Sequence, residues 1–104
     1  MRFEVLVTPR AEMELRAAAD WIAQRSPKAG EKWLNGFVNA LLSLAKNPRR
    51  CGLARESKGF PSELRQLLFG RHKNYRAVYT IRDRSVVVLA IRHTSQDDIS
   101  LDDF

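Results

Sequence analysis

Cysteine, histidine and long apolar runs are scarce in this 104-residue chain. It has one cysteine, Cys51, and two histidines, so neither an internal disulfide nor a cysteine-based metal site is expected. A chain that does not depend on disulfides is typical of the reducing cytoplasm. No apolar run approaches the roughly 18 residues of a membrane-spanning helix, and the opening MRFEVLV lacks the apolar region of a secretory signal. We therefore expect a cytoplasmic protein that needs no metal, no cofactor and no membrane.

The second half of the chain is rich in basic residues and poor in acidic ones until its last eight positions. The formal net charge is +6, and between residues 46 and 92 twelve Lys or Arg residues stand against three acidic ones. Four Asp and no basic residue fall in the last eight positions, DDISLDDF. A basic surface attracts polyanions or an acidic protein through its long-range field. The clustering favours a charged partner, while the plainer interpretation is that the basic residues serve solubility.

Two segments carry the start signals of helices. In residues 8–26, Thr8 can cap the helix and Pro9 suits its first position; in residues 26–48, Ser26 and Pro27 repeat this pattern. Apolar residues recur at helical spacing in both segments, and Asn47 with the proline after it ends the second. Because the turn between the segments is short, we expect an antiparallel pair of helices.

Four segments have the alternation and composition of strands: residues 2–8, 63–69, 75–81 and 85–93. The order strand, two helices, three strands predicts an α+β fold in one domain, residues 1–104, with an acidic tail at residues 93–104. We expect a four-stranded sheet, formed by the N-terminal strand and a three-stranded antiparallel meander, with the helices on one face. Residues 47–62 are the one long irregular connection.

The last two strands place basic residues among apolar ones, and their positions depend on register. If the turn is even, Arg82 pairs with Ser85 and Arg76 lies opposite Ile91. Arg76 and His93 are then diagonal neighbours on the open face of the sheet. The face expected against the helices carries the more uniformly apolar set: Tyr75, Ala77, Tyr79, Ile81, Val86, Val88, Ala90 and Arg92.

These motifs resemble the RelE/ParE superfamily of bacterial toxins from type II toxin–antitoxin modules. The similarity runs from VTPRAEMELRAAADWI to ELRQLLFGRHKNYRAVYTIRDRSVVVLAIRHTSQDD, nearly the whole chain. Its most characteristic parts are the GR…YRAVY strand and the strand end VVVLAIRHTSQDD. The superfamily holds two activities, so the resemblance indicates the fold and a toxin role more specifically than the target.

RelE-like members cut messenger RNA on the ribosome. For this activity the resemblance implies Arg76 as the phosphate clamp and His93 as the group that moves protons. However, Leu64 and Gln66 stand where RelE carries two lysines.

ParE-like members share the fold and poison DNA gyrase without cutting RNA. The pattern formed by Ile91, His93 and Asp97 is similar to theirs, which favours gyrase over ribosome-bound mRNA as the target. A third alternative is an inactive relative that only binds its antitoxin. For either target we expect nucleic-acid or target contacts from the remaining basic residues of the strand region: Arg65, Arg71, Lys73 and Arg92.

The resemblance also implies a partner. A basic toxin should be neutralised by a cognate acidic antitoxin whose amphipathic segment folds on its surface and forms a hetero-oligomer with it. We expect the aromatic residues of the helix pair to bind that segment: Trp21, Trp33 and Phe37. For the acidic tail, disorder and docking through Ile99, Leu101 and Phe104 both remain open.

Overall fold

The computed structural model describes residues 2–96. Its main elements are two α-helices and four β-strands. The elements are β1 (Glu4–Val7), α1 (Pro9–Ala23), α2 (Pro27–Leu42), β2 (Arg65–Phe69), β3 (Tyr75–Arg82) and β4 (Ser85–His93). The predicted acidic tail starts at the last residue of β4, and its residues 97–104 lie outside the described part. No helix among residues 2–96 is both long and apolar enough to cross a membrane.

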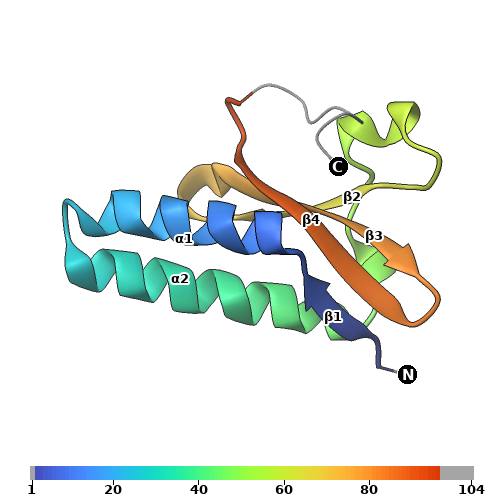
Figure 1. Cartoon of the computed structure of the whole chain (residues 1–104), viewed down its shortest axis with the longest axis horizontal. Helices are drawn as coiled ribbons and strands as arrows, with labels where there is room; N and C mark the ends of the chain where they lie inside the picture. Colours follow the sequence, from blue (N-terminus) through green and yellow to red (C-terminus); the bar gives the residue numbers. More distant parts are fainter. Residues whose placement is uncertain (1, 97–104) are drawn as a thin grey trace.

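The four strands form one sheet in the order β1-β4-β3-β2. β2, β3 and β4 are antiparallel neighbours, as the predicted meander requires, whereas β1 pairs in parallel with β4. The chain leaves β1, passes through both helices and three further strands, and returns beside its starting strand (Figure 1). The predicted α+β fold is therefore confirmed.

Both helices begin where the sequence predicts. The Thr8 hydroxyl accepts a hydrogen bond from the Ala11 N–H, and the Ser26 hydroxyl accepts one from the Ala29 N–H, each over 3.2 Å. A proline follows each cap at the first helical position, where its missing N–H costs nothing. The helices lie side by side (Figure 1) and share one face of the sheet. Their buried side chains, among them Leu15, Phe37 and Leu41, form the main core with Tyr79 and other residues of β3 and β4.

The register of β3 and β4 differs from the prediction because of a β-bulge. Arg82 pairs with Ser85 as expected, but the register shifts between Val78 and Tyr79. Beyond the shift, Arg76 pairs with Arg92 instead of Ile91. An extra residue in one strand exchanges the faces of everything that follows it. Ile91 consequently packs in the helix-side core, and Ala90, predicted on that side, packs in the cluster on the opposite face.

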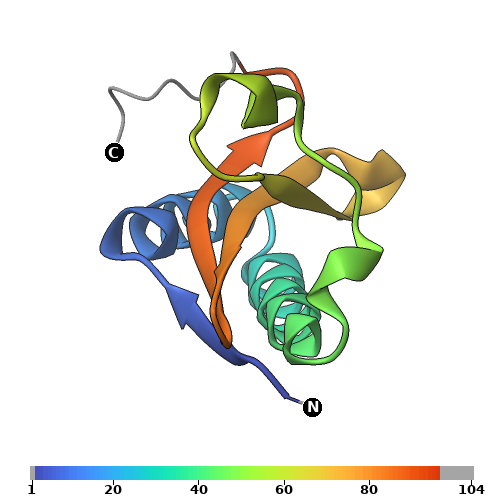
Figure 2. The ribbon, with the colours of Figure 1, turned by 90° about the vertical axis from the view of Figure 1, so that its right-hand side faces the viewer.

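That opposite face is covered, which corrects the prediction of an open face. Residues 51–64, here called the covering segment, lie across the sheet from the helices (Figure 2). Ala54 and Leu64 pack with Val78 and Ala90 of the sheet in a second apolar cluster. Ala54 and Leu64 also hydrogen-bond through their backbones over 2.8 Å, which closes the segment on itself. The connection that the sequence left irregular thus acts as a third layer.

The close approach of the two helices depends on Gly30. A Cβ at this position would lie 2.6 Å from the Ala23 Cβ and 2.9 Å from the Ala19 carbonyl oxygen. Replacing glycine by alanine inside a helix normally stabilises by up to about 1 kcal/mol. Here the clash involves a backbone atom that cannot move freely, and overpacking of this kind costs about 1–3 kcal/mol.

Gly30→Ala is therefore expected to lower the free energy of unfolding by about 1–2 kcal/mol, the clash outweighing the helix propensity. Urea unfolding followed by circular dichroism measures this change. Gly59→Ala is the matched control, because nothing lies within 4 Å of a Cβ at Gly59. A Gly30→Ala protein as stable as the wild type would show that the helix pair adapts to the added methyl group.

Candidate binding site

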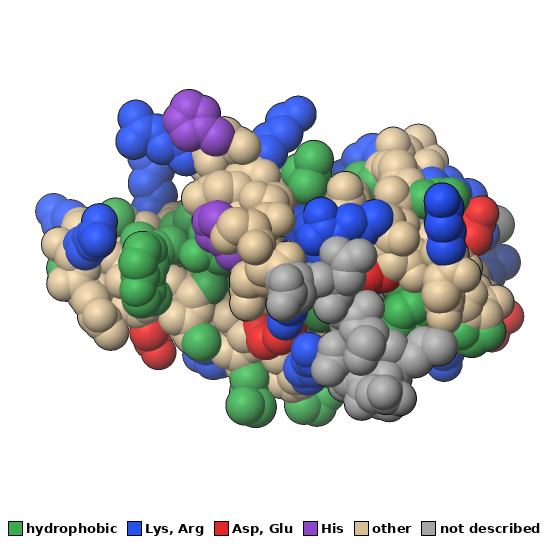
Figure 3. Space-filling model, turned by 90° about the horizontal axis from the view of Figure 1, so that it is seen from above, with side chains coloured by type: hydrophobic (Ala, Val, Ile, Leu, Met, Phe, Trp, Pro, Cys, Tyr) green, Lys and Arg blue, Asp and Glu red, His purple; other side chains and the backbone are tan. Residues whose placement is uncertain are grey.

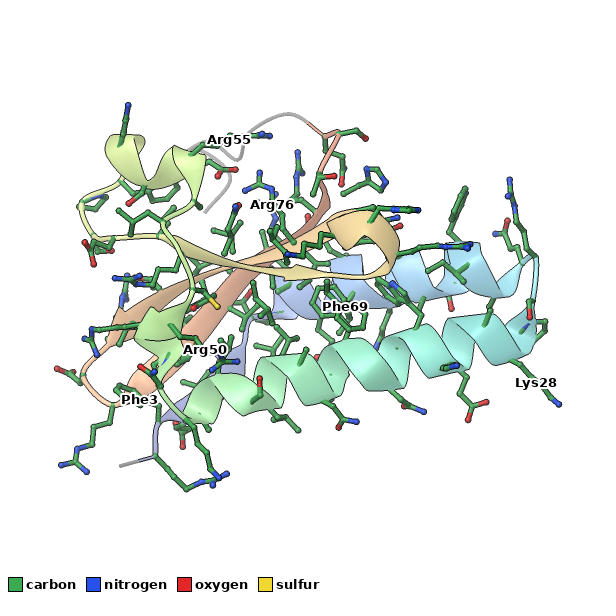
Figure 4. All side chains as sticks on the ribbon, turned by 180° about the vertical axis from the view of Figure 1, so that it is seen from behind. Phe3, Lys28, Arg50, Arg55, Phe69 and Arg76 are labelled. Atoms are coloured by element: carbon green, nitrogen blue, oxygen red, sulfur yellow. The ribbon has the colours of Figure 1, made fainter. Side chains whose placement is uncertain are left out.

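Arg76, the predicted phosphate clamp, is buried in an ion pair. Its side chain lies on β3 beneath the covering segment, and Arg76 is 2% exposed. Nη1 donates to Oε1 of Glu56 over 2.8 Å, and Nη2 donates to the other carboxylate oxygen. Gln66 on β2 accepts a further bond from Nη1 over 3.3 Å. Figure 4 shows Arg76 pointing away from the helices, whereas Phe69 points toward them.

Glu56 is the buried partner of Arg76 that sequence reasoning missed. It resembles an ordinary solvated carboxylate in the sequence, yet it is 6% exposed. It lies in the 3₁₀ turn η3 (Arg55–Gly59), which the covering segment holds over β3. A guanidinium that shares both Nη atoms with a buried carboxylate is already neutralised. In this arrangement Arg76 holds the covering segment on the sheet.

The prediction that Arg76 and His93 are diagonal neighbours on one face of the sheet is wrong. The bulge places His93 opposite Tyr75, and the two rings meet edge to face with centroids 5.1 Å apart. Tyr75 belongs to the helix-side core, while Arg76 faces the covering segment. The sheet therefore separates the two side chains that a shared nuclease site would need together.

The other predicted basic residues do not form one cluster. Arg65 donates to the carbonyl oxygens of Cys51 and Arg49, over 2.6 and 3.3 Å, and so fixes the start of the covering segment. Arg71 and Lys73 are exposed at the opposite end of β2. Arg92 is half-buried beside Arg76. Of these four residues, only Arg71 and Lys73 are exposed enough to contact a partner directly.

A groove of about 830 Å³ lies where the helix pair approaches the ends of β3 and β4. Arg71 contributes its side chain to the rim, and the walls are mainly apolar and aromatic. Figure 3 looks onto this side of the molecule and shows Lys and Arg side chains around exposed hydrophobic ones. The lining residues are Glu14, Ala17, Ala18, Trp21, Ile22, Trp33, Arg71, Asn74, Tyr75, Ile91, His93, Ser95 and Gln96.

Two of the three aromatic residues predicted to bind an antitoxin line this groove. Trp21 on α1 is 57% exposed, and Trp33 on α2 is partly buried against the core. Phe37 is fully buried, which corrects its assignment as a contact residue. It packs edge to face on Trp33, with ring centroids 5.3 Å apart. Phe37 therefore supports the groove from beneath.

The turn between β2 and β3 forms one wall and depends on Gly70. Gly70 has φ +91°, and a Cβ there would lie 2.6 Å from the Asn74 Oδ1. His72 and Lys73 also have positive φ values of 56° and 54°. This tight left-handed path keeps the basic side chains outward and brings Tyr75 into the groove. Burial raises the pKa of the Tyr75 phenol, so the phenol stays neutral near pH 7.

The groove has the apolar lining that suits contact with an amphipathic chain. Its apolar walls offer area for burial, while Arg71 and Glu14 line it with one side chain of each charge. Among residues 2–96 no cluster of three His, Cys, Asp or Glu side chains could hold a metal ion. The geometry therefore indicates a binding surface for an amphipathic segment.

Comparison with known proteins gives matches of two kinds. The family described as "ParE toxin of type II toxin-antitoxin system, parDE" matches residues 5–98. A solved structure described as "Chromosomal ParDE TA system from P. aeruginosa" superimposes with a TM-score of 0.71 at 20% identity. It covers 88% of this chain and 96% of that chain, and at this identity it supports the fold alone. No match was found among curated proteins.

Glu56→Ala is expected to lower the free energy of unfolding by about 3–5 kcal/mol, because Arg76 is left charged and buried without its carboxylate. Glu63→Ala is the control: that carboxylate is exposed and contacts Arg65 over 3.4 Å at the surface. Exposed pairs contribute about 0–1 kcal/mol. Denaturant unfolding measures both changes, and equal losses for the two variants would contradict a structural role for the buried pair.

Proposed function

Because the chain belongs to the ParE toxin family of type II toxin–antitoxin systems, as its motifs predicted, we propose that it inhibits growth by poisoning DNA gyrase. A cognate acidic antitoxin neutralises it by binding in the groove. The observation that supports this activity most directly is the burial of Arg76 against Glu56. A toxin that acts through protein contacts does not need that guanidinium to be accessible.

The RelE-like alternative finds less support in the geometry. Cleavage by 2′-hydroxyl attack needs a base, an acid and cations that converge on one phosphate. Arg76 and His93 lie on opposite faces of the sheet, as their partners Glu56 and Tyr75 do. Leu64, at one of the positions where RelE has lysine, is 1% exposed in the second apolar cluster. Gln66, at the other, bonds Arg76.

Inducible expression in bacteria tests the target. We expect growth arrest with trapped gyrase–DNA cleavage complexes and DNA-damage signalling, and intact messenger RNA at the same time points. Codon-positioned cuts in ribosome-bound messages would contradict the gyrase proposal in favour of nuclease activity. Normal growth in the absence of an antitoxin would contradict both and indicate a relative that only binds its antitoxin.

Neutralisation is tested separately at Trp21. This side chain is large, aromatic and 57% exposed in the groove. Truncating an aromatic residue of this type at an interface usually causes a large loss of binding free energy. Trp21→Ala is expected to weaken antitoxin binding by about 2 kcal/mol or more, roughly thirtyfold, as measured by calorimetry. Met13→Ala is the control, because Met13 is 72% exposed on the same helix and lies outside the groove. Equal effects of the two variants would place the antitoxin elsewhere.

A further inference from the structure

The groove ends in a tight turn, residues 93–96, here called the rim turn. Its backbone is held on the groove side by several hydrogen bonds. The Thr94 N–H donates to the Asn74 carbonyl over 2.8 Å, and the Ser95 N–H donates to Nδ1 of His93 over 3.1 Å. The Gln96 N–H donates to the His93 carbonyl, and the Gln96 side-chain oxygen accepts from the His93 N–H. His93, Ser95 and Gln96 all line the groove.

One further contact reaches the rim turn from the opposite face of the sheet. Nη2 of Arg55 donates to the Gln96 carbonyl oxygen over 3.2 Å. Arg55 begins η3 in the covering segment and is followed by Glu56, which Arg76 holds on β3. Figure 4 shows Arg55 and Arg76 on the side of the sheet away from the helices. The buried pair thus fixes the backbone that carries Arg55.

We propose that Arg55 is a positioning residue for the groove: from the covering segment it holds the rim turn in place, and it thereby sets the shape offered to the acidic segment of the antitoxin. The part that concerns the antitoxin rests on the proposed function. Arg55 does not line the groove, so its effect reaches the partner through Gln96 and the turn before it.

Through Arg55, the buried pair of Arg76 and Glu56 also affects the rim turn. Loosening Glu56 would free the backbone at Arg55, and the rim turn would lose its support from that side. A partner that binds against His93 and Gln96 would then have to order the turn as well as dock on it. Ordering a loop on binding lowers affinity, whereas a turn held in advance preserves it.

The first experiment uses the free protein and needs no partner. Amide hydrogen exchange is measured by NMR at Ser95 and Gln96 in the wild type, Arg55→Ala and Lys58→Ala. Lys58 is the matched control, because it is exposed in the same 3₁₀ turn and its replacement removes the same charge. Because Arg55→Ala removes the bond to the Gln96 carbonyl oxygen, we expect exchange to be about 2- to 10-fold faster in Arg55→Ala and unchanged in Lys58→Ala. Unchanged exchange in Arg55→Ala would overturn the proposal.

The second experiment measures the dissociation constant of a synthetic peptide that copies the acidic C-terminal segment of the antitoxin encoded beside this toxin. We expect Arg55→Ala to weaken binding about 2- to 10-fold and Lys58→Ala to leave it within twofold. Equal weakening by both variants would mean that Arg55 acts only through its charge, and would overturn the positioning role. Faster exchange in Arg55→Ala with no peptide binding by the wild type would instead contradict the proposed antitoxin site, while the support of the rim turn by Arg55 would stand.

Discussion

The ion pair between Arg76 and Glu56 is the interaction on which the sheet's second face depends. A buried charge is tolerated only when its partner has excellent geometry, and here both Nη atoms meet carboxylate oxygens while Gln66 accepts a third bond. Replacing such a pair by apolar residues is often neutral or stabilising, so its net contribution to stability is small. We infer that the main effect of the pair is on structural specificity: it determines where the covering segment lies on β3.

The β-bulge explains why His93 lies on the other face of the sheet from this pair. With regular pairing, Arg76 would share a face with His93, and a cationic site on the sheet would be reasonable. The shift between Val78 and Tyr79 moves Ile91 into the main core and leaves Arg76 beside Arg92. Bulges are common where a side chain must be redirected. Here the redirection separates an apolar groove, beside the helices, from a buried polar pair, beneath the covering segment.

The local parts of this structure were predictable from sequence, because their causes lie within a few residues. The Thr8 and Ser26 caps, the prolines after them and the alternation in the strands each act locally, and the structure confirms them. The bulge was not predictable, because alternating apolar residues read the same with one extra residue in the strand. The partner of Arg76 was hidden for a related reason: Glu56 lies 20 residues earlier, and nothing local shows that it is buried. In the groove, Trp21 and Trp33 were expected from the family resemblance, whereas the contribution of residues 93–96 depends on how elements distant in the sequence pack together.

The central claim is that Arg76 serves the structure and takes no part in chemistry. The most direct test is growth inhibition by the apolar double variant Arg76→Met with Glu56→Leu, after circular dichroism and denaturant unfolding have shown that it is folded. Because this variant removes both charges together, it leaves neither one buried alone. The account predicts that the folded double variant still arrests growth and still traps gyrase on DNA. A double variant that is as stable as the wild type but harmless to cells would contradict it, since the guanidinium itself would then be required.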